Sequence, residues 1–310
     1  MVGLPERFPS ATRQDETPTG KAKSLQTVIR LNMKQRVERY LTDQHSHLGQ
    51  LFPSSKASNR KSKIEDPKMN IGLLGYGKMG KEIEIVAKQR SHSISAVADI
   101  GSKLPDSRNQ FEQCDVLMDF SVATAVLEHV RFAALLKKPI VIGTTGWQKD
   151  LDEVKRLVNE SAIAAVFASN FSLGMNLFIS TVEKAAELFG KFEGFDAAVL
   201  EIHHNQKSDA PSGTAITIGN SILENFPSKK RLRTGLPDER IAKDELQVNS
   251  IRVGSEFGTH SVFFDSENDR IELTHTSRGR RGFALGAVIA AEWSVGKKGF
   301  YIFKDTLSKL

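Results

Sequence analysis

The sequence predicts an α/β protein with two folded parts, a doubly wound parallel sheet and a second α+β domain with a mixed or antiparallel sheet. Between residues 69 and 172, apolar runs of strand length alternate with amphipathic segments of helix length. Strands that are apolar throughout and alternate with helices are typical of a parallel sheet covered on both faces. After residue 196, strand-like segments follow one another too closely for crossover helices, which indicates the second sheet.

The elements follow in order along the chain. In the first part we expect strands at residues 70–74, 94–98, 116–120, 139–142 and 164–168, separated by amphipathic helices at 79–88, 124–136 and 148–161. A long helix at 175–189 leads to the second part, where we expect strands at 197–203, 249–253, 259–265 and 270–275 and a helix at 215–224. A last helix at 284–296 can return to the first sheet. The predicted division is therefore 69–172 plus 281–310 for one domain and 173–280 for the other.

The N-terminal segment 1–68 has a different composition. It carries 13 Lys and Arg against 7 Asp and Glu, whereas the rest of the chain is balanced, so the net charge of +6 lies in this segment. We predict a mostly disordered basic extension with a short helix at 25–41. Its acidic residues argue against a transit peptide, and Met69 directly before the first strand is an alternative translation start. Weak polyanion binding by the extension is a minor alternative, and the main body has no electrostatic support for specific nucleic-acid binding.

The composition excludes several other classes of protein. No apolar run approaches the roughly 18 to 20 residues that cross a bilayer, so no membrane role is expected. The single cysteine, Cys114, excludes an internal disulfide and a CxxC metal or redox site, and it fits a cytoplasmic location. The histidines include no HxxxH pair on a helix, so we predict no metal site.

The first chemical motif is the hexapeptide GYGKMG at residues 75–80, which follows the first strand and opens a helix. This GxGxxG pattern is typical of a Rossmann-type dinucleotide site, where glycines let the backbone approach a pyrophosphate at the helix N-terminus. The second strand ends at Asp99, 19 residues after Gly80, where a carboxylate accepts hydrogen bonds from a ribose diol. Because Ile100 stands where a 2′-phosphate favours a cation, we expect NADH, with NADPH as the alternative that nearby Lys103 leaves open.

Two further loops follow expected strand ends. They are GTTG at residues 143–146 and ASNF at 168–171. The carboxyl ends of parallel strands are where open α/β sheets bind ligands. Both loops are small and polar, as the approach of a nicotinamide ring to the backbone requires.

The run HHNQKSDAPSGTA at residues 203–215 is the most informative part of the sequence. A strand delivers His203 and His204, and Lys207 follows within a loop, so imidazole and ammonium can converge. The segment PSGT then opens a helix whose free N–H groups can bind an anion. Together these groups predict a pocket for a carboxylate substrate that also needs a proton donor.

These motifs resemble one family. The chain closely resembles 4-hydroxy-tetrahydrodipicolinate reductases, also called dihydrodipicolinate reductases, of lysine and diaminopimelate biosynthesis. The resemblance covers about residues 69 to 310 and rests on the strings, in chain order, GYGKMG, IGTTGW, ASNFSLGMN, HHNQKSDAPSGTA, RVGSEFGTHSVFF and RGFALGAV. The resemblance implies reduction of a cyclic, dicarboxylated imine by hydride from NAD(P)H. It also implies a dinucleotide-binding first domain, a substrate-binding second domain and assembly as a homotetramer through the second sheet.

The resemblance assigns roles residue by residue. It implies that the cofactor is bound by Gly75, Gly77, Lys78, Met79, Gly80, Asp99, Gly143, Thr144, Thr145, Ser169, Asn170, Phe171 and Arg280. His203 matches the general acid, and Lys207 matches a second proton donor or an orienting cation. The substrate carboxylates are assigned to His204, Gly213 and Thr214.

Two departures and two alternatives remain. The family often has Arg where Ile100 stands, and some members have Arg-Pro where this chain has Ser121-Val122-Ala123. Another two-domain NAD(P)-dependent dehydrogenase would share the glycine loop, although it would not need the histidine-lysine run. A non-catalytic nucleotide-sensing protein would bind the nicotinamide cofactor and leave the dihydropicolinate intermediate untouched.

Overall fold

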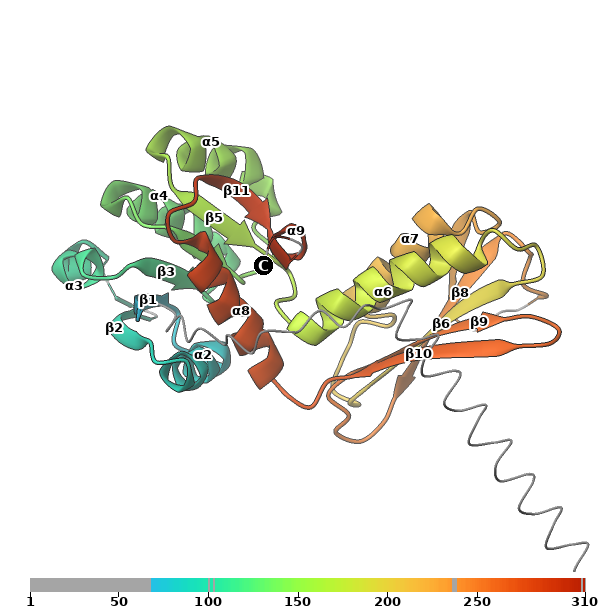
Figure 1. Cartoon of the computed structure of the whole chain (residues 1–310). Helices are drawn as coiled ribbons and strands as arrows, with labels where there is room; N and C mark the ends of the chain where they lie inside the picture. The colour runs from blue at the N-terminus through green and yellow to red at the C-terminus, as the bar shows by residue number, and fades with distance from the viewer. Residues whose placement is uncertain (1–67, 100, 103, 236–238, 308, 310) are drawn as a thin grey trace, which may run out of the picture. The chain divides into compact units, whose positions relative to one another are not determined.

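A computed structural model describes residues 68–99, 101–102, 104–235, 239–307 and 309. The predicted basic extension, the helix at 25–41 and the residues Ile100 and Lys103 lie outside this part, apart from Lys68 at its edge. Within it no helix is long and apolar enough to cross a membrane. Figure 1 shows the described elements, which form two separate sheets.

The first sheet is fully parallel. Its strands are β1 (Asn70–Leu74), β2 (Ser93–Ala98), β3 (Val116–Asp119), β4 (Ile140–Ile142), β5 (Ala164–Phe167) and β11 (Gly299–Ile302), in the spatial order β2-β1-β3-β4-β5-β11. The order reverses at β1, which lies between β2 and β3. Ligands of open α/β sheets bind beyond the carboxyl ends of the strands at such a switch point.

Helices cover both faces of this sheet, as its continuously apolar strands require. One face packs against α2 (Lys78–Gln89) and α8 (Arg281–Ser294), with Ile71, Ile83, Met118 and Val288 fully or almost fully buried between them. The opposite face carries α3 (Arg108–Glu112), α4 (Val126–Leu136) and α5 (Leu151–Ser161). Short 3₁₀ turns complete this part at Leu104–Ser107, Ala123–Ala125 and Gln148–Asp150, and α9 (Phe303–Leu307) follows β11.

The second sheet is mixed. Its strands are β6 (Asp196–His203), β7 (Arg231–Thr234), β8 (Glu245–Arg252), β9 (Thr259–Asp265) and β10 (Arg270–Thr276), in the order β10-β9-β6-β8-β7. Strand β6 pairs antiparallel with β9 and parallel with β8. The long helix α6 (Leu173–Phe189) and α7 (Gly213–Asn225) pack side by side over one face of this sheet (Figure 1), where Val182, Ile218 and Val248 are fully buried.

The predicted fold class is confirmed, and most element boundaries agree within a few residues. Strands β1 and β9 begin and end where the sequence predicts them, whereas β8 begins four residues earlier than predicted, at Glu245. The elements α3, β7, β11 and α9 were not predicted. Each of these four is only four or five residues long, too short for periodicity to distinguish it from a loop.

Helix α8 supports the loop that follows β5. A Cβ atom on Gly286 would lie 1.8 Å from the carbonyl oxygen of Phe171, so only glycine lets α8 approach this loop. We expect Gly286→Ala to lower the free energy of unfolding by about 2 kcal/mol or more, because the buried backbone must shift. Urea denaturation measures the change. Gly282→Ala, where the nearest foreign atom would be 4.0 Å away, is the matched control in the same helix and should lose no stability; equal losses would contradict the packing argument.

Candidate active site

A cavity of about 310 Å³ lies at the carboxyl ends of β1, β2 and β3. Its lining includes Gly75, Gly77, Asp99, Ser121 and His129. The backbone of Gly75 is left-handed, with φ +98°, and a Cβ there would lie 2.5 Å from the carbonyl oxygen of Phe120. A Cβ on Gly77 would meet nothing within 4 Å. This open backbone beside a helix N-terminus is the surface that a pyrophosphate needs.

Other residues of the glycine motif serve packing and position. Gly80 lies so close to the first glycine that its Cβ would be 2.5 Å from the Gly75 carbonyl oxygen, which explains the third glycine of the motif. Lys78 and Met79 form the first turn of α2 and are not among the residues lining this cavity. Asp99 Oδ1 accepts a 3.4 Å hydrogen bond from the Tyr76 backbone N–H, so the carboxylate is held beside the glycine loop.

The loop at 143–145 has one residue at a second, larger cavity of about 740 Å³. Thr145 lines this cavity. Thr144 is buried instead, and its hydroxyl donates a 2.7 Å hydrogen bond to Asp119 Oδ1. A Cβ on Gly143 would overlap the Phe120 ring, at 2.1 Å. Gly143 and Thr144 therefore set the shape of the loop by packing against Phe120 and bonding to Asp119. Neither residue lines the cavity.

The loop after β5 is divided in the same way. Ser169 and Asn170 line the larger cavity, and Asn170 Nδ2 donates a 3.5 Å hydrogen bond to Thr214 Oγ1. Phe171 is buried, with its ring centroid 5.0 Å from that of Phe303. The predicted nicotinamide-side loop thus reaches the predicted substrate-binding helix through Asn170, and Phe171 anchors it.

Strand β6 delivers His203 to the same cavity. Residues alternate along the strand, so Glu201 and His203 share the helix-covered face, and both are buried. His203 Nδ1 forms an ion pair with Glu201 Oε2. Burial lowers the pKa of His203, against the opposing effect of the Glu201 carboxylate, while Lys207 and Arg252 lower it further. His203 lines both the larger cavity and an adjoining one of about 380 Å³, which His204 also lines.

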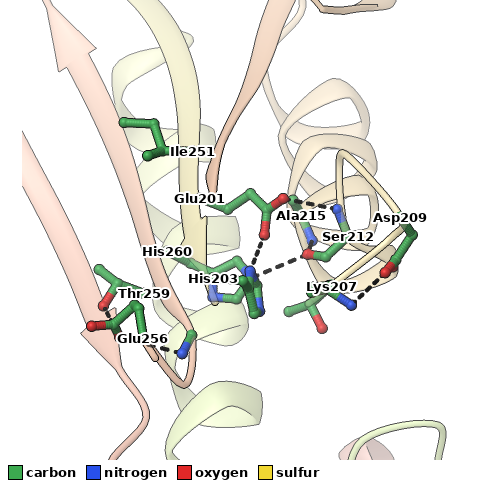
Figure 2. A network of polar contacts seen from close by, with 12 residues as sticks. Glu201, His203, Lys207, Asp209, Ser212, Ala215, Ile251, Glu256, Thr259 and His260 are labelled. Carbon is green, nitrogen blue, oxygen red and sulfur yellow. Dashed lines mark hydrogen bonds and ion pairs between the residues drawn. The ribbon is translucent and has the colours of Figure 1, made fainter. Parts of the chain in front are cut away.

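The loop after β6 brings in the lysine and the helix terminus. Lys207 lines the larger cavity, and its Nζ lies 2.7 Å from Asp209 Oδ1; Figure 2 shows this pair. This hydrogen bond lowers the pKa of Asp209. Ser212 caps α7, accepting a 3.2 Å hydrogen bond from the Ala215 N–H. Gly213 and Thr214, at the start of α7, line the cavity, so an ammonium group and a helix N-terminus face one space, which suits a carboxylate.

Three residues around His203 were missed as functional candidates, namely Glu201, Arg252 and His260. Figure 2 shows Glu201, Ser212 and His260 gathered around it. Arg252 of β8 stands in register with His203, and His260 of β9 stands in register with Glu201. Burial lowers the pKa of His260 to about 4. The spacing of Glu201 two residues before His203 was the one signal for this cluster, because residues i and i+2 of a strand share a face.

This cluster also raises the question of a metal ion. Ligand atoms of Glu201, His203 and His260 lie within 4.8 Å of one another. However, Arg252 Nη2 is 2.7 Å from Glu201 Oε1, and a guanidinium this close disfavours a second cation. The cluster is better explained as a network of hydrogen bonds and ion pairs, and the expectation that no metal takes part stays a prediction.

Arg280 lines none of the three cavities described so far. It lines another cavity with Arg278 and Arg281, and its guanidinium lies 5.5 Å from the centroid of the Phe257 ring. Phe257 in turn lines the cavity that contains His204. Of the candidate residues, the structure therefore gathers Thr145, Ser169, Asn170, His203, Lys207, Gly213 and Thr214 at one cavity.

Two models of one protein family match this chain. Residues 69–171 match the model of the dihydrodipicolinate reductase N-terminus, and residues 174–307 match that of the dihydrodipicolinate reductase C-terminus. The chain belongs to the dihydrodipicolinate reductase family. The resemblance inferred from the motifs is confirmed.

Individual relatives agree with this assignment. A 4-hydroxy-tetrahydrodipicolinate reductase of Christiangramia forsetii is 42% identical over 242 residues, which are 78% of this chain and 99% of the relative. Another, from Caldanaerobacter subterraneus, is 35% identical over 75% of this chain and 95% of its own. The solved dipicolinate-bound dihydrodipicolinate reductase of Paenisporosarcina sp. is 25% identical, with a TM-score of 0.63 over 77% of this chain and 99% of that one.

Proposed function

We propose that this protein reduces 4-hydroxy-tetrahydrodipicolinate to tetrahydrodipicolinate with a nicotinamide cofactor, in lysine and diaminopimelate biosynthesis. The family membership supports the reaction class. The observation that carries the assignment to this chain's own residues is the cavity of about 740 Å³ that His203, Lys207 and the N-terminus of α7 share with Thr145 and Asn170. A different NAD(P)-dependent dehydrogenase would not need the first three groups together.

The substrate is a ring with two carboxylates, and residues of this cavity and of the adjoining one suit both. We assign one carboxylate to the N-terminus of α7, where Gly213 and Thr214 offer backbone N–H groups and a positive helix end. We assign the other to His204 and Lys207. A substrate carboxylate reaching Lys207 competes with Asp209, its present partner.

The bound cofactor supplies the hydride when its reduced nicotinamide is present. The 4-hydroxy ring loses its hydroxyl as water, which leaves a conjugated imine; as a ring carbon of that imine accepts the hydride, electron density moves toward the ring nitrogen, and a proton must arrive. His203 holds that proton as general acid; because burial lowers its pKa, the imidazolium gives the proton up readily, and less of it is present as the pH rises. Lys207 stabilises the developing negative charge and orients the ring. The glycines 75 and 77 would bind the pyrophosphate and Asp99 the ribose, which fits the open backbone at Gly77.

We propose NADH as the preferred cofactor. Asp99 lines the smaller cavity with Gly75 and Gly77, where a carboxylate favours a ribose diol and repels a 2′-phosphate. Asp99→Asn should weaken NADH binding about tenfold, the scale of a lost hydrogen bond to a charged group, and change NADPH binding less. Fluorescence titration with both cofactors measures this. Wild-type protein that binds NADPH tenfold more tightly than NADH would contradict the preference.

We propose that residues 69–172 plus 281–310 form the dinucleotide-binding domain and that 173–280 bind substrate and carry the contacts of a homotetramer in the cytoplasm. The function itself is tested by coupling the protein to the synthase that precedes it and following oxidation of NADH and NADPH. Oxidation that depends on the synthase supports the reductase. Cofactor binding without oxidation would favour the non-catalytic nucleotide sensor.

A further inference from the structure

We propose that Glu201 and Arg252 form a positioning pair that sets the geometry of the proposed active site, with the buried Glu201 orienting the His203 imidazole and the half-buried Arg252 holding the loop that carries Lys207. The inference deepens the proposed function and rests on it for the role of His203. Neither residue touches the substrate in this account. Both act through the groups they hold.

Glu201 connects two parts of the site. Its side chain is fully buried on β6. One oxygen, Oε2, pairs with Nδ1 of His203, and the other, Oε1, accepts a 3.1 Å hydrogen bond from the Ser212 backbone N–H at the start of α7. A single carboxylate therefore fixes the imidazole and the helix N-terminus relative to each other. With Nδ1 held by the carboxylate, Nε2 is the nitrogen left to exchange a proton with a ligand.

Arg252 completes this arrangement from β8. Its Nη2 donates to Glu201 Oε1 at 2.7 Å and to the Asp209 carbonyl oxygen at 2.5 Å, and its Nε donates to the Lys207 carbonyl oxygen at 3.3 Å. The guanidinium thereby connects the carboxylate to two backbone positions of the lysine loop. A planar fork with several fixed donors can do this, whereas a lysine ammonium presents a single point of charge.

The neighbouring groups confine the His203 imidazole. The imidazole of His203 is also bounded by Gly258, where a Cβ would lie 2.9 Å from Nε2, and its centroid is 5.2 Å from that of the edge-on His260 ring. The carboxylate on one side and the glycine on the other leave the ring little freedom to turn. Burying a carboxylate costs free energy of desolvation, so we expect Glu201 to hold a group that has a function.

The charged groups around His203 determine in which direction each substitution should change the His203 pKa. Glu201 faces it from its own strand, Lys207 from the following loop, Arg252 from β8 and His260 from β9. His204 and His275 line the adjoining cavity, and the residues of α6 that line the larger cavity, Asn176 and Ile179, carry no charge. The anion favours the imidazolium and the cations disfavour it. Neutralising Glu201 and neutralising Arg252 should thus change the His203 pKa in opposite directions.

The experiment compares Glu201→Gln, Arg252→Gln and Arg252→Lys with wild type. The rate constant kcat/KM should fall as pH rises through the His203 pKa, because the acid must be protonated. Glu201→Gln should move this falling limb to lower pH by about one unit, and Arg252→Gln should move it to higher pH. Both should lower kcat about tenfold or more. Arg252→Lys keeps the charge and loses the fork, so it should lower kcat and leave the limb in place.

The matched control is the pair Arg231 and Glu245 of the same sheet. These side chains also pair across neighbouring strands, with 3.2 Å between Arg231 Nε and Glu245 Oε1, and they line none of the cavities described above. Arg231→Gln and Glu245→Gln should leave kcat and the pH profile unchanged. Changes as large as those of the pair Glu201 and Arg252 would overturn the proposal, since they would reflect a general effect on the sheet.

A second measurement separates this inference from the reaction assignment. Histidine-selective ¹³C NMR, with the His203 signal assigned by its loss in His203→Gln, reports the pKa of His203 without turnover. Opposite shifts in the two neutralised variants support the positioning pair even where wild type fails to reduce the substrate, in which case the proposed function alone is wrong. Active wild type with an unmoved or equally moved pKa in both variants overturns the positioning pair. If the His203 signal of Glu201→Gln cannot be resolved, Glu201→Asp takes its place; this variant keeps the charge, so its His203 pKa should stay close to that of wild type.

Discussion

Replacing His203 by glutamine should reduce kcat about 100-fold or more, the usual scale for losing a general acid. The imidazole lines the cavity shared with Lys207 and the α7 N-terminus, and glutamine preserves its approximate size while removing the titratable proton. The affinity for NADH should stay close to that of wild type, because Gly75, Gly77 and Asp99 line a different cavity. Steady-state kinetics and fluorescence titration measure the two effects.

His204 provides the comparison for this variant. It is the adjacent imidazole but lines only the adjoining cavity, so His204→Gln should raise KM for the dicarboxylate more than it lowers kcat. A His203→Gln enzyme that turns over within threefold of wild type would remove His203 from the mechanism.

The second large effect is expected for Lys207→Ala, which should also lower kcat about 100-fold or more. The change removes the cation that stabilises charge developing on the substrate ring, a contribution of this size when an electrostatic partner is lost. KM for the substrate should rise as well, since the same ammonium is assigned to a carboxylate. The measurement is again steady-state kinetics, with thermal unfolding to check that the fold is retained.

Asp209→Asn separates the charge of Lys207 from its ion pair. If the lysine acted only by holding the loop through Asp209, 2.7 Å away, the two variants would behave alike. We expect Asp209→Asn to keep most of the activity, because the backbone of this loop is also held by Arg252. Equal losses in both variants would contradict a direct role for the lysine in the reaction.

The sequence predicted the fold class because its signal is strong: continuous apolar strands alternate with amphipathic helices over more than half of the first domain. Two glycines of the predicted motif have structural reasons that are local. Gly75 needs a left-handed backbone, and Gly80 needs to approach the preceding turn, both of which follow from the motif itself. Short edge strands such as β7 and β11 carry too few residues for any periodicity, so pairing with a neighbouring strand defines them.

The sequence predicted the part of the candidate site that comes from one contiguous run of residues. His203, Lys207, Gly213 and Thr214 lie within a single strand-loop-helix segment, so their convergence is local. Arg252 and His260 join them only because β8 and β9 flank β6 in register, which strand spacing does not reveal. Side-chain direction within a loop was equally beyond the motif, as Thr144 shows: its hydroxyl turns inward to Asp119, while neighbouring Thr145 faces the cavity.

In the proposed function, His203 and Lys207 act on a dicarboxylated ring while it takes hydride from the cofactor. A direct test supplies NADH that carries deuterium at both C4 positions, generates the substrate with the preceding synthase, and determines the mass of the product. We predict a tetrahydrodipicolinate that carries one deuterium, formed at least 100-fold more slowly by His203→Gln and Lys207→Ala. A product without deuterium, or one formed by both variants at the wild-type rate, would contradict the account.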